Sequence, residues 1–182
     1  GCTNEENLES IEDTVTAAVN VGKEAMIDCE HFFDGFKANP DYALACARTA
    51  YQAGARWVVL CDTNGGTLPD EIHSIVTKVQ EVVPGTHLGI HTHDDTGQAV
   101  ANSLAAIDAG VRQVQGTING LGERCGNANL ITLIPTLMLK PQYAHRLEIS
   151  VSADQLQDIT AVSHAFDEVL NRSPARPAPS VR

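Results

Sequence analysis

The stretch HLGIHTHDDTGQAVANSLAAIDAGVRQVQGTI, residues 87–118, contains a strand pattern, a helix pattern and a second strand pattern. The two strand candidates, 87–94 and 111–118, alternate apolar and polar residues. Between them, 97–109 is rich in Ala, and Gly110 follows it directly, as expected where a helix ends. A strand, a helix and a strand of this length form the unit from which parallel sheets are built.

The same alternation of strand and helix patterns occurs along most of the chain. Two further strand patterns cover 24–31 and 57–63. Helix patterns are expected at 5–21, 40–53, 69–82, 97–109 and 128–139. Repeats of about 30 residues are typical of βαβ units, so the sequence predicts an α/β protein with a parallel sheet.

One face of the predicted sheet is polar near the carboxyl ends of its strands. Successive side chains point to opposite faces of a strand, so His91 and His93 share one face and Ile90 lies on the other. Glu30 and Thr63 end two other strands on the polar face. Such a face is typical of the interior of a (β/α)8 TIM barrel near its active site, and a complete barrel takes roughly 250 residues. We therefore predict four βα units, about half of a barrel.

The end of the chain follows a different pattern. Residues 152–170 have the pattern of one amphipathic helix with no strand before it, and 173–182 is rich in Pro, Ala and Arg. We expect two parts: 1–140, the half-barrel, and 141–182, a linker with a helix and a Pro-rich end.

The composition limits the classes of partner and location. The formal net charge is −11, which argues against nucleic acid or an anionic membrane surface as a partner. No stretch approaches the roughly 20 apolar residues of a membrane-spanning helix, and no signal-peptide pattern is present. We expect a soluble, cytoplasmic protein. Five widely spaced cysteines without a C-x-x-C pair suggest neither a disulfide framework nor a zinc knuckle.

The segment His91-Thr92-His93 is a candidate metal site. The i, i+2 spacing on a strand brings both imidazoles to one face, close enough to share a divalent ion. The alternative is two polar residues that hydrogen-bond to neighbours at a strand end. Asp94 points to the other face, which favours a role either in fixing the turn or in holding the tautomer of a histidine. Asn127 follows the glycine-rich loop 120–126 and is either an oxygen ligand or the N-cap of the next helix.

Glu30 and Thr63 are candidates for substrate chemistry. Glu30 could transfer a proton or polarise a carbonyl by hydrogen bonding, although an ordinary solvent-paired acid fits the same position. Thr63 begins the run Thr-Asn-Gly-Gly, whose hydroxyl and backbone N–H groups could hold a small carboxylate. The alternative is a strand-to-helix turn that needs glycine for its backbone conformation.

The run GIHTHDDTGQAVANSLAAIDAGVRQVQGTINGLGERCGNANL, residues 89–130, resembles the α-isopropylmalate, homocitrate and citramalate synthase family. Members of that family are metal-dependent (β/α)8 barrels that join an acyl-CoA to an α-keto acid by a Claisen-type condensation. The segments EHFFDG, 30–35, and CDTNGGTLP, 61–69, are similar to the citramalate synthase branch, which condenses acetyl-CoA with pyruvate in isoleucine biosynthesis. The resemblance implies an acyltransferase. Isopropylmalate or homocitrate synthesis, a CoA-dependent lyase or aldolase on the same barrel, and an inactive half-barrel are the alternatives.

The resemblance also implies roles for individual residues. His91 and His93 match the metal-binding imidazoles of the family, and Asn127 matches the asparagine near or on the metal. Thr63 matches the threonine that holds the keto-acid carboxylate, and Glu30 the acidic residue beside the substrates. Asn119 and Gly120 begin the N-G-x-G-E-R element and are predicted to bind substrate. The implied cofactor is a divalent ion, Mn, Mg or Zn, with acetyl-CoA as co-substrate.

Two motifs of the family do not occur in this sequence. One is the D-R-x-x-R-D-G segment of the first barrel strand, which supplies an Asp ligand and an Arg for the keto acid. The other is the H-K-G-G-x-H element after the barrel, which is linked with the general base of a neighbouring subunit. We therefore expect the C-terminal half of the barrel, which carries part of a metal site and is inactive alone, in a protein that is a homodimer when intact.

Overall fold

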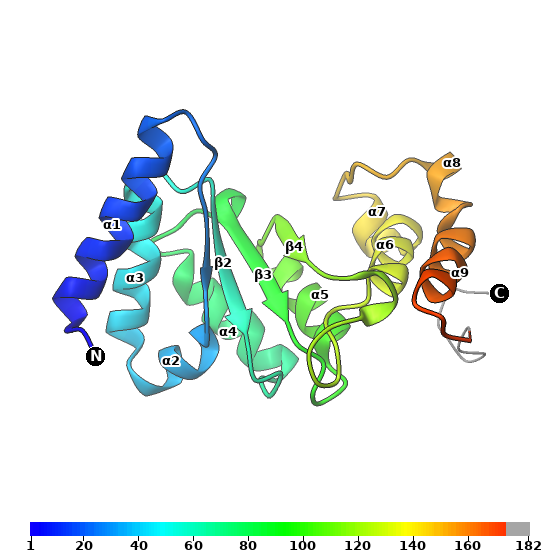
Figure 1. Cartoon of the computed structure of the whole chain (residues 1–182), viewed down its shortest axis with the longest axis horizontal. Helices are drawn as coiled ribbons and strands as arrows, with labels where there is room; N and C mark the ends of the chain where they lie inside the picture. Colours follow the sequence, from blue (N-terminus) through cyan, green and yellow to red (C-terminus); the bar gives the residue numbers. More distant parts are fainter. Residues whose placement is uncertain (174–182) are drawn as a thin grey trace.

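The computed structural model describes residues 1–173 and contains a parallel sheet of four strands in the order β1-β2-β3-β4. The strands are β1 Met26–Cys29, β2 Trp57–Asp62, β3 Leu88–Thr92 and β4 Gln113–Gln115. Each neighbouring pair is parallel, and helices follow the strands in sequence (Figure 1). The prediction of a partial (β/α) barrel is confirmed.

Helices cover one face of this sheet. The helical elements are α1 Asn4–Asn20, α2 Phe32–Ala38, α3 Pro40–Gln52, α4 Pro69–Val79, η1 Gly85–His87, α5 Ala99–Ala109, η2 Ile118–Gly120, α6 Leu130–Leu139, α7 Pro141–Ala144, α8 Ala153–Leu156 and α9 Ile159–Val169. The main core joins β2 and β3 to α1, α3, α4 and α5, and Leu60 and Ile90 are fully buried in it. Val58, Leu60, Leu88 and Ile90 therefore face the helices, and His91 and Gln115 lie on the opposite face.

The C-terminal helices lie at the far end of the molecule from α1 (Figure 1). A second, smaller core joins Ile107 of α5, Leu133 and Leu137 of α6, and Tyr143 of α7. None of the helices within 1–173 is both long and apolar enough to cross a membrane. The five cysteines are all free.

Several predicted boundaries are wrong. The strand predicted at 111–118 has only three residues, because the chain turns into η2 at Ile118. The helix predicted at 152–170 is two helices, α8 and α9. Between them the backbone N–H groups of Gln157 and Asp158 donate to carbonyl groups three residues earlier, instead of the four-residue spacing of an α-helix. Residues 174–182 of the predicted Pro-rich end lie outside the described residues.

Helix α2 was not predicted from the sequence. It starts after His31, whose backbone is left-handed with φ 54°, and it contains a glycine, which is a poor helix former. Phe32 and Phe33 are buried, so apolar burial rather than helix propensity stabilises this short helix.

Candidate active site

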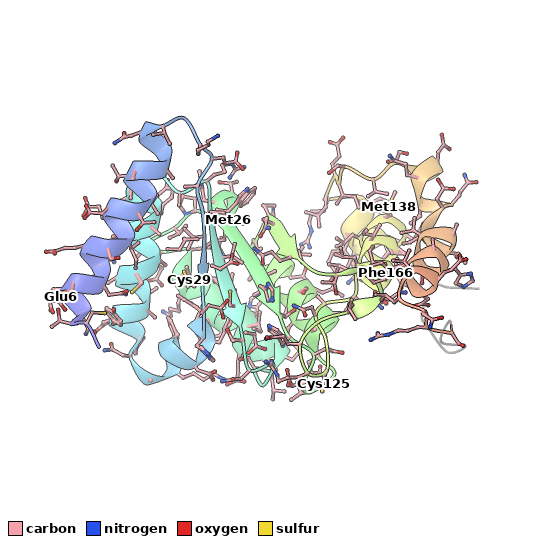
Figure 2. The ribbon with its side chains drawn as sticks, in the orientation of Figure 1. Glu6, Met26, Cys29, Cys125, Met138 and Phe166 are labelled. Carbon is pink, nitrogen blue, oxygen red and sulfur yellow. The ribbon has the colours of Figure 1, made fainter. Side chains whose placement is uncertain are left out.

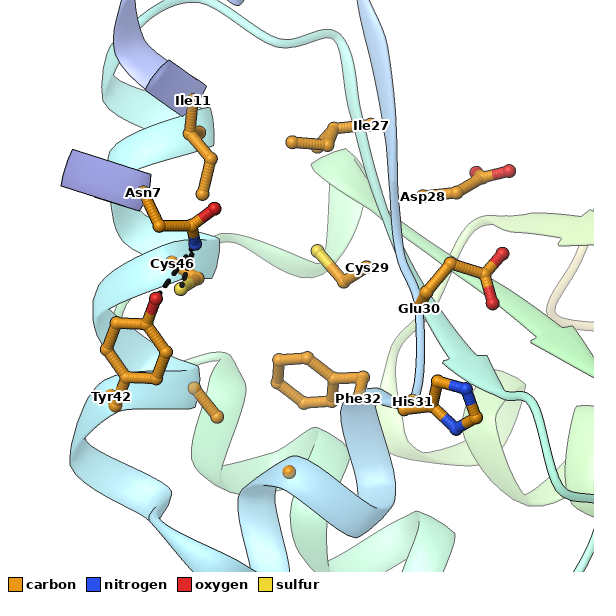
Figure 3. A pocket seen from close by; sticks show the side chains of 12 residues that line it. Asn7, Ile11, Ile27, Asp28, Cys29, Glu30, His31, Phe32, Tyr42 and Cys46 are labelled. Carbon is orange, nitrogen blue, oxygen red and sulfur yellow. Dashed lines mark hydrogen bonds between the residues drawn. The ribbon is translucent and has the colours of Figure 1, made fainter. Parts of the chain in front are cut away.

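The predicted site residues gather where the strands end at their carboxyl side. Cα pairing places Cys61 of β2, His91 of β3 and Gln115 of β4 in one row across the sheet. Around β1, Asp28 and Glu30 point to one side, and Cys29 points to the other, toward a pocket that Asn7, Tyr42 and Cys46 also line (Figure 3). The carboxyl groups of Asp28 and Glu30 therefore point away from the thiol of Cys29, although both residues also line this pocket.

His91 and His93 lie side by side, as the strand spacing predicted. Their ring centroids are 5.0 Å apart. His93 is buried, and within 1–173 its Nδ1 has no hydrogen-bond partner. Burial lowers the pKa of His93, as do the positive charges of His91 and Arg124 to a smaller extent, so the neutral imidazole is favoured. Only the neutral form can donate a lone pair to a metal ion.

Asn127 completes this cluster. Its Nδ2 lies 2.8 Å from Nε2 of His91. The alternative role as an N-cap is wrong, because the side chain of Asn129 accepts the capping bond from Ile131 N at 3.0 Å. Backbone bonds hold Asn127 in place: its N–H donates to Gly120 O at 3.1 Å.

The cluster partly fits a divalent ion. Within 1–173 no group of three or more His, Cys, Asp or Glu side chains could hold a metal. The available donors are two imidazoles and one amide, which are ligand types suited to divalent metals. The unpartnered Nδ1 of buried His93 supports a ligand at this position, because a buried polar atom without a partner is costly. A complete site needs further ligands.

Glu30 and Thr63 meet at neighbouring strand ends. The hydroxyl of Thr63 donates to Glu30 Oε2 at 2.9 Å and accepts the backbone N–H of His31 at 2.7 Å. The turn after Thr63 needs glycine at Gly65, where φ is +60° and a Cβ would come within 2.8 Å of the backbone of Asp95. The backbone conformation of the turn therefore requires glycine at Gly65. The same turn places the Thr63 hydroxyl beside Glu30.

A buried polar network holds this turn against α5. Asp62 Oδ1 accepts from Thr67 Oγ1 at 2.8 Å, and Asn102 Nδ2 donates to Thr67 O at 2.7 Å. Asp62, Thr67 and Asn102 are all buried. Burial raises the pKa of Asp62, and the Thr67 hydrogen bonds oppose that rise. Asp94 fixes the start of α5, as predicted, by accepting from Ala99 N at 2.8 Å.

Arg124, for which no role was predicted, links the glycine-rich loop to two strand ends. It donates to Asp95 through Nε at 2.7 Å and Nη2 at 2.9 Å, and to Thr63 O at 2.6 Å. Hydrogen bonding to Arg124 lowers the pKa of Asp95. Cys125 of this loop lies at the lower edge in Figure 2, the edge toward which β2 and β3 run. The loop therefore covers the carboxyl end of the sheet.

Asn119 and Gly120 begin the glycine-rich loop that leads to Asn127. Asn119 does not continue the strand conformation, because it is a left-handed residue of η2 with φ 57°. Its Nδ2 donates to Ser163 O and Asp167 Oδ1 of α9, both at 3.0 Å, and its Oδ1 accepts from Ser163 Oγ at 2.6 Å. Gly120, with φ +67°, accepts the N–H of Asn127. A substrate-binding role for either residue stays a prediction.

Comparisons with known proteins decide the family. The HMGL-like family model matches residues 1–165. The chain belongs to the HMGL-like family. It is 50% identical over 183 residues to the (R)-citramalate synthase of Synechocystis, covering 97% of this chain and 32% of that protein. The 2-isopropylmalate synthase of Nitrobacter hamburgensis is 44% identical over 128 residues, 69% of this chain and 24% of that protein.

The HMGL-like fold is also evident in solved structures. The hydroxymethylglutaryl-CoA lyase of Pseudomonas aeruginosa superposes with a TM-score of 0.75 at 22% identity, covering 98% of this chain and 59% of that chain. This likeness shows the fold alone. The chain spans about a third of the length of the curated relatives it matches.

Proposed function

We propose that the protein containing this chain is an acyltransferase that condenses acetyl-CoA with pyruvate to (R)-citramalate, a step of isoleucine biosynthesis. The observation that carries the proposal is the 50% identity, over nearly the whole chain, to a protein named (R)-citramalate synthase. In the reaction, the acetyl methyl group loses a proton and its carbon bonds to the keto carbon of pyruvate. Water then hydrolyses the thioester and releases CoA.

His91, His93 and Asn127 are the residues of this chain that would hold a divalent ion, Mn, Mg or Zn. Such an ion supplies Lewis acidity, which polarises the ketone of the keto acid. The adjacent imidazoles and the unpartnered Nδ1 of His93 support this assignment. Asn127 lies beside them with Nδ2 facing Nε2 of His91, so its amide would turn to offer Oδ1 to the ion. The remaining ligands would come from outside the described residues.

Thr63 and Glu30 would act on the organic substrates. In this structure the Thr63 hydroxyl donates its single proton to Glu30 at 2.9 Å, so the hydroxyl would turn from Glu30 to the substrate when it holds the keto-acid carboxylate. Glu30 is exposed and acts as the catalytic carboxyl group, hydrogen-bonding to the reacting keto acid or thioester. Arg124 keeps the Thr63 backbone in place through its bond to Thr63 O. Asn119 and Gly120 are proposed to bind substrate through their backbone groups, because both ends of the Asn119 side-chain amide bond to α9.

The remaining proposals concern the domains, oligomeric state, location and partners of the intact protein. We propose that 1–140 belongs to the catalytic barrel as its C-terminal half, and that 141–182 is a linker region. The synthase resemblance supports a homodimer and a cytoplasmic location for the intact protein, and inactivity of the 182-residue chain alone. The net charge of −11 supports small molecules rather than nucleic acid or membranes as partners.

The test is release of free CoA thiol from acetyl-CoA by the protein expressed from its complete gene, with Mn or Mg. Pyruvate, 2-ketoisovalerate and 2-ketoglutarate are compared as acceptors. Pyruvate-selective release that His91→Ala abolishes, and that His73→Ala on the exposed side of α4 leaves unchanged, supports the proposal. Selectivity for 2-ketoisovalerate favours isopropylmalate synthesis, consistent with the Nitrobacter relative. Absence of release with all three acids overturns the synthase proposal.

A further inference from the structure

A chain of hydrogen bonds runs from β1 to the metal cluster across the polar face. Gln115 Oε1 lies 2.6 Å from Nδ1 of His91, and Gln115 Nε2 donates to Asp28 Oδ1 at 2.9 Å. Asp28 and Gln115 are 87 residues apart in sequence and lie on β1 and β4, with β2 and β3 between them. The sheet is curved enough for the two side chains to meet.

The direction of each bond follows from the chemistry of the groups. An ionised carboxylate only accepts hydrogen bonds, so the NH₂ of Gln115 must face Asp28. Its carbonyl oxygen then faces His91 and can only accept. Nδ1 of His91 therefore carries the proton, and in the neutral imidazole the lone pair lies on Nε2. That nitrogen is the one that lies 2.8 Å from Asn127.

We infer that Asp28 and Gln115 are positioning residues that fix His91 in the tautomer whose Nε2 can bind a metal ion. The inference rests on the metal site of the proposed function and assigns it two supporting residues. Asp28 acts through Gln115, whose amide would otherwise be free to turn either end toward His91. Groups that hold a ligating histidine in this way typically contribute a factor of about 10 to 100 to metal affinity.

The first test is the tautomer of His91 in the metal-free protein, expressed from its complete gene. Long-range ¹H–¹⁵N NMR at about pH 8.5, where an ordinary imidazole is neutral, distinguishes a proton on Nδ1 from one on Nε2. The wild-type protein is expected to carry the proton on Nδ1. A proton on Nε2 of His91 would overturn the inference without any variant.

The second test measures the affinity for Mn²⁺ by titration, detected by electron paramagnetic resonance. Gln115→Met keeps the length of the side chain and removes both hydrogen-bonding groups, and a 10- to 100-fold weaker affinity is expected. Asp28→Asn leaves the Gln115 amide without a fixed orientation, so a mixture of His91 tautomers and a several-fold weaker affinity are expected. Met26→Leu is the matched control, because it removes only the weak bond from the same Gln115 nitrogen to Met26 Sδ, at 3.5 Å, and leaves the bond to Asp28 in place.

The two proposals fail in different ways. If His91→Ala does not change Mn²⁺ affinity, the metal site of the proposed function is wrong. If His91→Ala abolishes binding while Gln115→Met and Asp28→Asn match the Met26→Leu control in affinity and tautomer, only the positioning inference is wrong. Circular dichroism spectra and melting temperatures show whether each variant is folded. If a variant is unfolded, the His91 tautomer of the wild-type protein alone tests the inference.

Discussion

Nδ2 of Asn127 lies 2.8 Å from Nε2 of His91, although 36 residues separate the two in sequence. The other end of the same amide packs against Gly122, where a Cβ atom would overlap Asn127 Oδ1. The glycine-rich loop therefore has a steric function at this position: it leaves room for the asparagine side chain beside the histidine pair.

Gly122→Ala is accordingly expected to displace Asn127 and to weaken Mn²⁺ binding about 10- to 100-fold, a loss typical of disturbed ligand support. Titration of the protein expressed from its complete gene measures this effect. Gly35→Ala is the matched control, because a Cβ at Gly35 meets nothing within 4 Å and its φ is not positive. Equal affinities of the two variants would show that Asn127 does not support the site.

The period-two alternation of the strands predicted much of this site. It placed His91 and His93 on one face, and the structure confirms that their rings are neighbours. The contact between Asp28 and Gln115, by contrast, depends on the curvature of a sheet whose two outer strands meet through side chains. That curvature is set by packing across the whole sheet, so local spacing could not predict the contact.

Other features could not be predicted because they depend on contacts between distant segments. Asn127 and Asn129 are equally good candidates for an N-cap, and the fold gives the cap to Asn129 because Asn127 bridges to His93 in the loop. Asn119 comes directly after a predicted strand, but both ends of its side-chain amide form hydrogen bonds with residues of α9. In each case tertiary contacts, rather than local propensity, decided the outcome.

The start of α4 predicts a pH-dependent contribution to stability. Glu71 accepts the backbone N–H of Leu68 at 2.9 Å and pairs with Lys37 at 3.0 Å, and these contacts lower its pKa below the ordinary value of 4.5. A carboxyl group whose pKa is lower in the folded state stabilises the protein above its unfolded pKa. This contribution is lost as the pH falls through the folded pKa.

Glu71→Gln should therefore reduce the free energy of unfolding by about 0.5 kcal/mol near pH 7, a small effect because the pair is solvent-exposed and screened. The difference from wild type should shrink as the pH falls below 4.5. Urea denaturation across this pH range measures it, with Asp70→Asn in the same helical turn as the control. A difference that is constant with pH would contradict the assignment.

The contact between α9 and η2 predicts that the C-terminal helices stabilise the loop that carries Asn127. Ser163 Oγ donates to Asn119 Oδ1 at 2.6 Å, and Ser163 is only 2% exposed. Asn119 is left-handed, a conformation that asparagine adopts more readily than most residues, and its bonds to α9 hold the side chain in place. The loop from Gly120 to Asn127 starts at this point, so its geometry depends on α9.

Ser163→Ala should leave Asn119 Oδ1 without its buried donor and destabilise the region by about 1 to 2 kcal/mol. Hydrogen exchange should therefore accelerate at the amides of Gly120 and Leu121, which donate to Thr117 O and Ile118 O. Ser10→Ala on the exposed side of α1 is the matched control, because it reports only the gain in helix propensity from serine to alanine. If exchange at these two amides is the same in both variants, η2 holds its conformation without α9, and the C-terminal helices have no part in positioning Asn127.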